Sequence, residues 1–246
     1  MIQAHTEKSQ NLILSIIIAT YNAELHIKGC LDSIVDNVFE PYELIIIDGK
    51  STDRTLEIIN SFNSLHATII SEADKGIYDA LNKGISYARG KWVIFLGADD
   101  RLLPTFTSLL HELTDQRAIY YGNCKNGSNQ LGGRFTAKKL AKMNLCHQAI
   151  LYPLTALKRY QFDLNYPVFA DYLLNMQCWG DASIVKNYLD IDIAYYHMEG
   201  FSATANDPGF KADKPRLVRQ HLGYIAYFKY LFRKFKESRN PASKFF

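Results

Sequence analysis

Paired cysteines are lacking in this 246-residue sequence. Its four cysteines, Cys30, Cys124, Cys146 and Cys178, are widely spaced, and no CxxC pair occurs. The spacing suggests neither a disulfide framework nor a thiolate zinc site, and a reducing compartment fits best. The sequence also lacks an apolar run long enough to cross a bilayer, and MIQAHTEKSQ lacks the pattern of a secretory signal. We expect a cytoplasmic protein.

Two common phosphate-binding motifs are also missing. In GISYARGKW, five residues separate Gly84 from Gly90 where a P-loop needs four, and Trp92 stands at the position of the magnesium-binding Ser or Thr. No GxGxxG follows the first predicted strand. These absences argue against ATPase and dehydrogenase functions. A nucleotidyltransferase would need a Gly-rich basic loop after that strand, and ATYNAELH does not supply one.

Charge is nearly balanced over the chain, with a net value of +3, but it is unevenly distributed. From Lys211 onward there are ten Lys/Arg and two Asp/Glu, whereas the preceding part contains 18 and 23. Only the tail is therefore expected to attract an anionic partner. The acidic body, without a recognisable binding module, argues against nucleic acid as that partner.

Short apolar runs alternate with helical stretches in the first half of the chain, which is typical of βαβ units. We therefore expect an α/β fold with a mostly parallel sheet flanked by helices. The predicted strands cover residues 12–20, 42–49, 66–72, 91–98 and 118–123. Beyond them we expect a strand at 147–153, a helix at 169–179, a strand at 182–197 and a helix at 215–235.

Polar side chains follow four consecutive predicted strands, at the edge where open parallel sheets bind ligands. They are Thr20, Tyr21 and Asn22, then Asp48, then Asp74, and finally Asp99 and Asp100. Taken singly, Thr20 or Asn22 could cap the helix that follows, Ser51 or Asp53 the helix that starts near Arg54, and Asp100 a helix with Pro104 in its first turn. A cap does not explain the second carboxylate of GADD, whereas Mg²⁺ or Mn²⁺ does, since these ions combine one or two carboxylates with phosphate oxygens. The doublet predicts a metal that carries a diphosphate, with Asp99 as its ligand and Asp100 either bracing the site or contacting a sugar hydroxyl.

Five segments of the chain carry a family resemblance. LSIIIATYNAE, IIIDGKSTDRT, SEADKGIYDALNKGISYARGKWVIFLGADD, HQAILYP and FADYLL, in this order, resemble the bacterial family 2 glycosyltransferases, especially the exopolysaccharide and O-antigen branch. The resemblance spans Leu14 to about Ser202. It implies a GT-A fold, with a nucleotide-sugar half at about 12–123 and an acceptor half at about 124–210 of a domain covering 1–210. Residues 211–246 would form a basic, amphipathic helical tail.

The resemblance also implies an activity and roles for individual residues. An inverting enzyme would transfer a sugar from a nucleotide diphosphate sugar, by default a UDP-sugar, to an acceptor hydroxyl, such as one on a lipid-linked glycan. Such a single displacement needs a general base. The implied roles are the base for Asp171, the nucleotide pocket for Thr20, Tyr21, Asn22 and Asp48, the donor cleft for Asp74 and Asn82, Mn²⁺ or Mg²⁺ for Asp99, Asp100 and His197, and the acceptor side for His147 and Gln148.

Other interpretations of the same residues stay open. Asp171 could simply favour a helix N-terminus through the macrodipole, and His147 could be a structural hydrogen bonder. The family usually has Asp or Asn where this chain has Gly97, and Gly where it has Glu199, so a degenerate transferase that only binds nucleotide sugar or scaffolds a complex is an alternative. The tail helix carries Lys229 and other cations beside an aromatic stripe, which suits either a membrane surface or packing on the domain.

Overall fold

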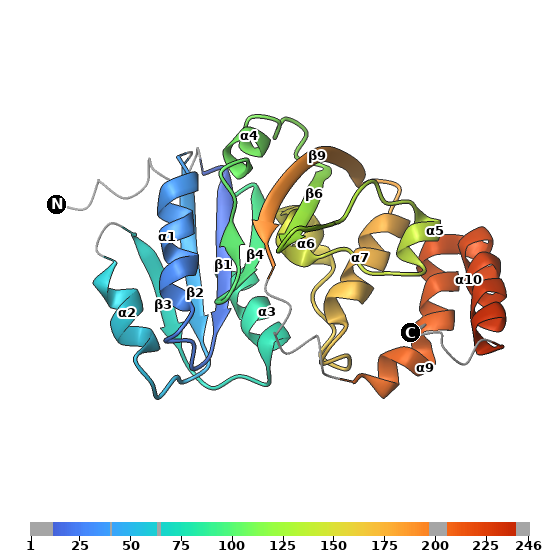
Figure 1. Ribbon diagram of the computed structural model, residues 1–246, viewed down its shortest axis with the longest axis horizontal. Coiled ribbons are helices and arrows are strands. Elements are labelled where there is room, and N and C mark those ends of the chain that lie inside the picture. Colours follow the sequence, from blue (N-terminus) through green and yellow to red (C-terminus); the bar gives the residue numbers. More distant parts are fainter. Residues whose placement is uncertain (1–11, 40, 63–64, 197–205, 240–246) are drawn as a thin grey trace.

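The structure is a computed structural model, and it describes residues 12–39, 41–62, 65–196 and 206–239. Within them, helices flank a single large sheet (Figure 1). The strands are β1 (Leu14–Thr20), β2 (Tyr42–Asp48), β3 (Ala67–Ser71), β4 (Trp92–Gly97), β5 (Arg101–Leu102), β6 (Ala118–Asn126), β7 (Asn129–Leu131), β8 (Ile150–Pro153) and β9 (Val185–Tyr195). The α-helices are α1 (Ile27–Asn37), α2 (Thr55–Ser61), α3 (Ile77–Tyr87), α4 (Phe106–Leu110), α5 (Ala137–Leu140), α6 (Leu154–Arg159), α7 (Ala170–Gly180), α9 (Pro208–Leu217) and α10 (Gly223–Ser238).

The first four strands pair in parallel, which confirms the predicted βαβ units. The order along the sheet is β3-β2-β1-β4-β8-β6-β9-β5, with β7 beside β6. Thr20 at the end of β1 lies opposite Asp48 of β2, and Ala19 lies opposite Gly97 of β4. The carboxyl ends of β1, β2 and β4 therefore meet at one edge of the sheet, as predicted from the polar residues that follow these strands.

The second half of the chain extends the same sheet with mixed pairing. β8 is antiparallel to β4 on one side and to β6 on the other, and β9 runs parallel to β6 across a bulge. The strand expected at 147–153 begins as a short 3₁₀ turn, His147–Ala149, before β8. The predicted boundary at 123/124 falls inside β6, so the division into halves stays a proposal.

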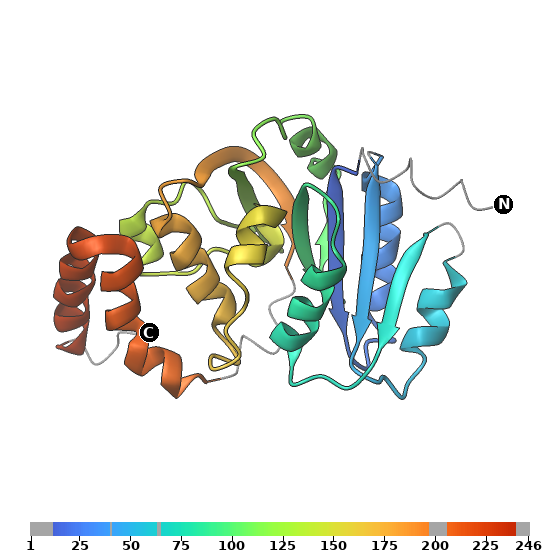
Figure 2. The same ribbon diagram turned by 180° about the vertical axis from the view of Figure 1, so that it is seen from behind.

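Helices cover both faces of the sheet, so its central parallel strands β1, β2 and β4 are buried on both sides. Ile16 and Ile18 of β1 belong to the core that includes α1, whereas Ile17 and Ala19 belong to the core that includes α3. Figure 1 shows α1 in front of the strands, and Figure 2 shows α3 on the opposite face. Burial on both faces explains why β1 reads as an uninterrupted apolar run.

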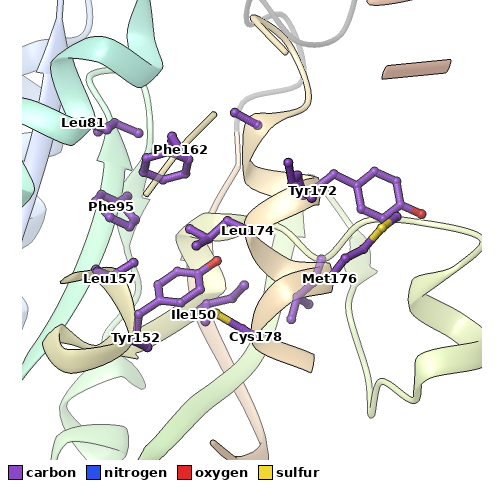
Figure 3. Packing of buried hydrophobic residues seen from close by; sticks show 14 of the residues in the cluster. Leu81, Phe95, Ile150, Tyr152, Leu157, Phe162, Tyr172, Leu174, Met176 and Cys178 are labelled. Atoms are coloured by element: carbon purple, nitrogen blue, oxygen red, sulfur yellow. The ribbon is translucent and has the colours of Figure 1, made fainter. Parts of the chain in front are cut away.

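The segment between α6 and α7 packs onto the α3 side of the sheet through Phe162. Its ring lies 5.1 Å from that of Phe95 on β4 and 5.1 Å from that of Tyr78 on α3, measured between centroids. Figure 3 shows Phe162 beside Phe95 and Leu81. This aromatic contact joins the second half of the chain to the edge where the strands end.

The tail differs from the single helix expected at 215–235. Helix α9 begins earlier, where Asp207 accepts a hydrogen bond from the backbone N–H of Phe210 at 2.9 Å, and a π-helical turn, Val218–Leu222, separates it from α10. Gly223 has a φ of +81°, in the left-handed region that favours glycine, and it interrupts the helix. No helix in the described ranges is long and apolar enough to span a membrane.

Candidate functional site

A cavity of about 530 Å³ opens at the carboxyl ends of β1 and β4. Five of the residues singled out from the sequence line it: Thr20, Tyr21, Asn22, Asp74 and Asp99. The other lining residues are Ala19, Ala23, His26, Lys75, Gly76, Ile77, Tyr78, Ala80, Gly97, Ala98, Leu164 and Pro167. Side chains from three strand ends thus converge on one hollow of the size that binds a small ligand.

The loop after β1 is locked to the loop after β2. The backbone N–H of Asn22 donates to Ser51 Oγ at 2.8 Å, and Asn22 Oδ1 accepts from the backbone N–H of Thr52 at 2.9 Å. At the next residue, the backbone N–H of Ala23 donates to Thr55 Oγ1 at 2.7 Å. Asn22 has a φ of +46°, which asparagine tolerates better than most residues. The cavity rim is therefore pre-shaped by the protein.

Thr20 brings a polar atom that the described residues leave without a partner. Its Oγ1 is buried and forms no hydrogen bond within the described part of the chain. A buried hydroxyl without a partner costs about 1–3 kcal/mol. Because Thr20 lines the cavity, a ligand bound there is the natural partner for this hydroxyl.

Asp48 and Asn82 do not line the cavity, although both were expected on the donor side. The carboxylate of Asp48 accepts from the backbone N–H of Ser51 at 3.1 Å and from Ser71 Oγ at 2.6 Å. Asn82 donates to the carbonyl of Phe162 at 2.8 Å and accepts from its N–H at 3.0 Å. Both side chains brace neighbouring segments, and their contact with a donor stays a prediction.

The two carboxylates of the doublet differ in their access to the cavity. Asp99 lines the cavity, whereas Asp100 is 1% exposed and accepts from the backbone N–H of Gly97 at 2.8 Å. Burial, with the nearby charge of Asp99, raises the pKa of Asp100 to about 6. Helix α4 begins only after Thr105, so the alternative that Asp100 caps the following helix is wrong.

The two carboxylates lie so close to residue 97 that they explain why a glycine is found there. A Cβ at residue 97 would lie 2.7 Å from Asp99 Oδ1 and 2.9 Å from Asp100 Oδ2, closer than real Cβ contacts allow. Glycine at this position therefore lets both carboxylates lie over the end of β4. An Asp or Asn side chain here would displace one of them.

The described residues contain no group of three or more His, Cys, Asp or Glu that could hold a metal ion by itself. Asp99 alone of the doublet faces the cavity. Mg²⁺ binds through one or two carboxylates, with water and substrate phosphates completing its shell, so the donor set fits a metal that arrives with a diphosphate. His197, the third predicted ligand, lies outside the described residues.

Asp171 lies one side chain behind the cavity, in the first turn of α7. Its Oδ1 accepts from the hydroxyl of Tyr78 at 3.0 Å, and its Oδ2 accepts from Asn144 Nδ2 at 2.8 Å. Tyr78 lines the cavity and Asp171, 7% exposed, does not. Its position in the first turn is also favourable toward the helix macrodipole, so the two interpretations of Asp171 are compatible.

The residues expected on the acceptor side surround the two buried aspartates. His147 Nδ1 is 3.5 Å from Asp171 Oδ2. Burial lowers the pKa of His147, but the hydrogen bond and charge of Asp171, with the charge of Asp100, outweigh burial and leave the pKa raised. The Gln148 side chain is buried, and its polar interaction with Asp100 lowers the pKa of that carboxyl group against the effect of burial. Neither His147 nor Gln148 lines the cavity.

Sequence reasoning missed part of the lining. Lys75 follows Asp74 directly and could have been found by the same strand-end argument, as a cation near a diphosphate. Ile77, Leu164 and Pro167 carry no chemical signal of their own. Leu164 and Pro167 are more than 60 residues beyond β4, and the long-range contacts of their segment, which include the packing of Phe162 and the hydrogen bonds of Asn82, bring them to the cavity.

Comparison with known proteins identifies relatives over most of the chain. Residues 15–170 match the family model described as glycosyl transferase family 2. A "PGL/p-HBAD biosynthesis glycosyltransferase" of Mycobacterium tuberculosis is 36% identical over 222 residues, which cover 84% of this chain and 86% of the relative.

Solved structures share the fold. Staphylococcus aureus TarS 1–349 has a TM-score of 0.68 at 20% identity, with 94% of this chain and 74% of that chain covered. The mannosyltransferase PcManGT from Pyrobaculum calidifontis, solved with GDP-Man and Mn²⁺, has a TM-score of 0.61 at 18% identity and covers 92% of this chain and 66% of that chain. The fold is thus the GT-A fold, and the chain belongs to glycosyl transferase family 2.

Proposed function

We propose that this glycosyltransferase moves a sugar from a nucleotide diphosphate sugar to an acceptor hydroxyl with inversion at the anomeric carbon. One observation carries the proposal: Asp99 and the Thr20 hydroxyl, which has no partner among the described residues, line one cavity, and Tyr78 connects that cavity to Asp171. Binding groups for a donor and a base for an acceptor are therefore within one site.

In the proposed reaction, the acceptor oxygen attacks the anomeric carbon from the side opposite the diphosphate. The new glycosidic bond forms as the bond to the diphosphate breaks, and the acceptor proton passes to Asp171. The hydrogen bonds from Tyr78 and Asn144 orient this carboxylate. A carboxylate is suitable as the base when its surroundings keep it ionised and correctly placed.

A divalent cation fits the donor end of the cavity. Asp99 would hold Mn²⁺ or Mg²⁺ together with the donor diphosphate, and the ion would neutralise charge on the leaving nucleoside diphosphate. Lys75 lines the same cavity and adds positive charge there. The neighbour PcManGT was solved with Mn²⁺, which supports this proposal by analogy.

The donor we propose is a UDP-sugar. TarS, which shares the fold, has been solved with UDP and with UDP-GlcNAc, whereas PcManGT was solved with GDP-Man. A thermal-shift panel of UDP, GDP, dTDP and CDP, each with Mn²⁺ and with EDTA, tests the proposal, because a ligand of the native state raises the melting temperature. We expect a base-selective, metal-dependent shift that Asp99→Ala abolishes.

The base is tested separately. Asp171→Asn should abolish transfer and leave the nucleotide-induced shift intact, while Asp32→Asn, on the exposed side of α1, should leave both unchanged. Full turnover by Asp171→Asn would remove this residue from the mechanism. A protein that shows no nucleotide-induced shift would instead support the alternative of a degenerate transferase that acts as a scaffold.

We further propose that the acceptor is a lipid-linked glycan and that the enzyme works at the inner face of the cell membrane. Helix α10 packs against α5 through its buried side, yet five of its large side chains are 54–70% exposed: Tyr224, Ile225, Phe228, Phe232 and Phe235. Lys229 lies beside Lys138 and Lys142 of the α5 region, and the charge of Lys138, with that of Lys142, lowers its pKa. Clustered cations next to exposed aromatic side chains suit an anionic bilayer surface.

Flotation with vesicles of neutral or anionic lipid tests the membrane proposal. Wild type should float with anionic vesicles, and the double variant Phe228→Ser with Phe232→Ser should not. Tyr87→Ser is the matched control, because Tyr87 is 49% exposed at the end of α3. Equal flotation of the double variant and wild type, or none of either, would contradict the proposal.

A further inference from the structure

We propose that the acceptor carries an apolar aglycone, an alkyl or aryl group, next to the hydroxyl that receives the sugar. This inference deepens the proposed function and rests on it. It comes from one side of the cavity, here called the acceptor wall, formed by Ile77, Tyr78, Leu164 and Pro167.

Two separate segments build the acceptor wall, and hydrogen bonds hold them together. Ile77 and Tyr78 begin α3, whereas Leu164 and Pro167 belong to the segment between α6 and α7. The hydroxyl of Tyr78 lies 2.9 Å from the carbonyl oxygen of Val168, next to Pro167. One turn further along α3, Asn82 forms its two hydrogen bonds with the backbone of Phe162. The wall is therefore a fixed surface.

The wall offers apolar side chains where a sugar would need polar ones. Ile77 is 37% exposed and Leu164 is 42% exposed, although both line a cavity. Single exposed apolar side chains are normal on proteins, but three aliphatic residues here face one hollow. Ile, Leu and Pro side chains cannot pair with sugar hydroxyls. Contact with an apolar group would remove their surface from water, which is favourable.

The rest of the lining combines small apolar residues, Ala19, Ala23, Ala80 and Ala98, with charged and polar ones. Asp74, Lys75 and Asp99 are charged, and the Thr20 hydroxyl has no partner in the described part of the chain. These groups suit the diphosphate and the sugar of a donor. The acceptor wall, in contrast, adjoins the proposed base, because Tyr78 contacts both the cavity and Asp171. The apolar part of the ligand is thereby placed next to the acceptor hydroxyl.

Binding of methyl, butyl and hexyl β-D-glucosides, measured by calorimetry in the presence of UDP and Mn²⁺, tests the inference. Each buried methylene is worth roughly 0.8 kcal/mol, or about fourfold in affinity. We expect hexyl glucoside to bind on the order of tenfold more tightly than butyl glucoside. Leu164→Ser and Ile77→Thr should each reduce that ratio severalfold and leave UDP affinity unchanged.

Val35→Ser is the matched control, since Val35 is 40% exposed on α1 and does not line the cavity. It should keep the full dependence on chain length. Equal affinity for the three glucosides, no binding of any, or a chain-length dependence that survives both wall variants would overturn the inference. Failure of the proposed function would look different, because UDP itself would then give no binding signal.

Discussion

Replacing Thr20 by Val should have opposite effects on stability and on donor binding. Valine keeps the shape of threonine and removes the hydroxyl, whose oxygen is buried without a partner among the described residues. Without nucleotide, we expect the free energy of unfolding to rise by about 1 kcal/mol, at the low end of the cost of an unpaired buried polar group. With nucleotide, a ligand hydrogen bond worth about 1 kcal/mol is lost, so affinity should fall about fivefold.

Thr55→Val provides the matched control. Thr55 is also buried, but its hydroxyl donates to Asp53 Oδ1 at 2.6 Å and accepts from the N–H of Ala23 at 2.7 Å. Its replacement leaves the N–H of Ala23 unpaired, so we expect a loss of about 1–3 kcal/mol in unfolding free energy.

Urea titration with and without UDP and Mn²⁺ measures both effects. If Thr20→Val destabilised the nucleotide-free protein as Thr55→Val does, the Thr20 hydroxyl would have a protein partner after all. If UDP stabilised the variant as much as wild type, the hydroxyl would not contact the donor. Either result would refute the reasoning from the unpaired atom.

Two further predictions concern the side chains behind the cavity. Asn82→Ala should lower the free energy of unfolding, measured by urea titration, by about 2–4 kcal/mol, because it leaves the N–H and carbonyl of Phe162 unpaired. The affinity for UDP should not change. As a control, Asn60→Ala, at an exposed position, should change neither quantity. A large fall in UDP affinity would instead make Asn82 a donor ligand. Protonated His147 stabilises the folded protein through the nearby charge of Asp171, which raises the pKa of His147. This contribution to stability is complete at pH values below the ordinary pKa of 6.5, and it is lost as the pH rises through the raised pKa. The stability difference between wild type and His147→Gln should therefore be larger at pH 6 than at pH 8.5, and a pH-independent difference would contradict this sign.

The parallel part of the sheet was predictable because its cause is local. Strands buried on both faces must be apolar throughout, so β1 and β4 stand out in the sequence, and the polar residues after them mark the edge of the sheet. That argument placed Thr20, Asn22 and Asp99 at the site, where they line the cavity. This prediction from strand ends needs no knowledge of any long-range contact.

Side-chain direction was not predictable in the same way. Asp48 also ends a strand, yet Ser71 on the neighbouring strand supplies a hydrogen bond that turns its carboxylate into the sheet edge. Asp100 turns back onto the backbone of Gly97. The prediction of one continuous helix in the tail was wrong because of the backbone at Gly223. Its left-handed φ interrupts a helix that the spacing of apolar residues alone would continue. These outcomes depend on hydrogen bonds and backbone conformations that the pattern of apolar and polar residues does not predict.

The continuity of the sheet from β4 through β8 to β6 limits how enzymes of this kind can be recombined. A chimera joined near residue 123 would exchange part of β6 together with β8 and β9, and would thereby rebuild four strand interfaces at once: β4 with β8, β6 with β8, β6 with β9, and β5 with β9. An exchange of residues 160–169 alone would leave every strand pairing intact, because this segment lies between α6 and α7. With the role proposed for the acceptor wall, grafting this short segment between relatives would exchange Leu164 and Pro167 and leave Thr20 and Asp99 in place.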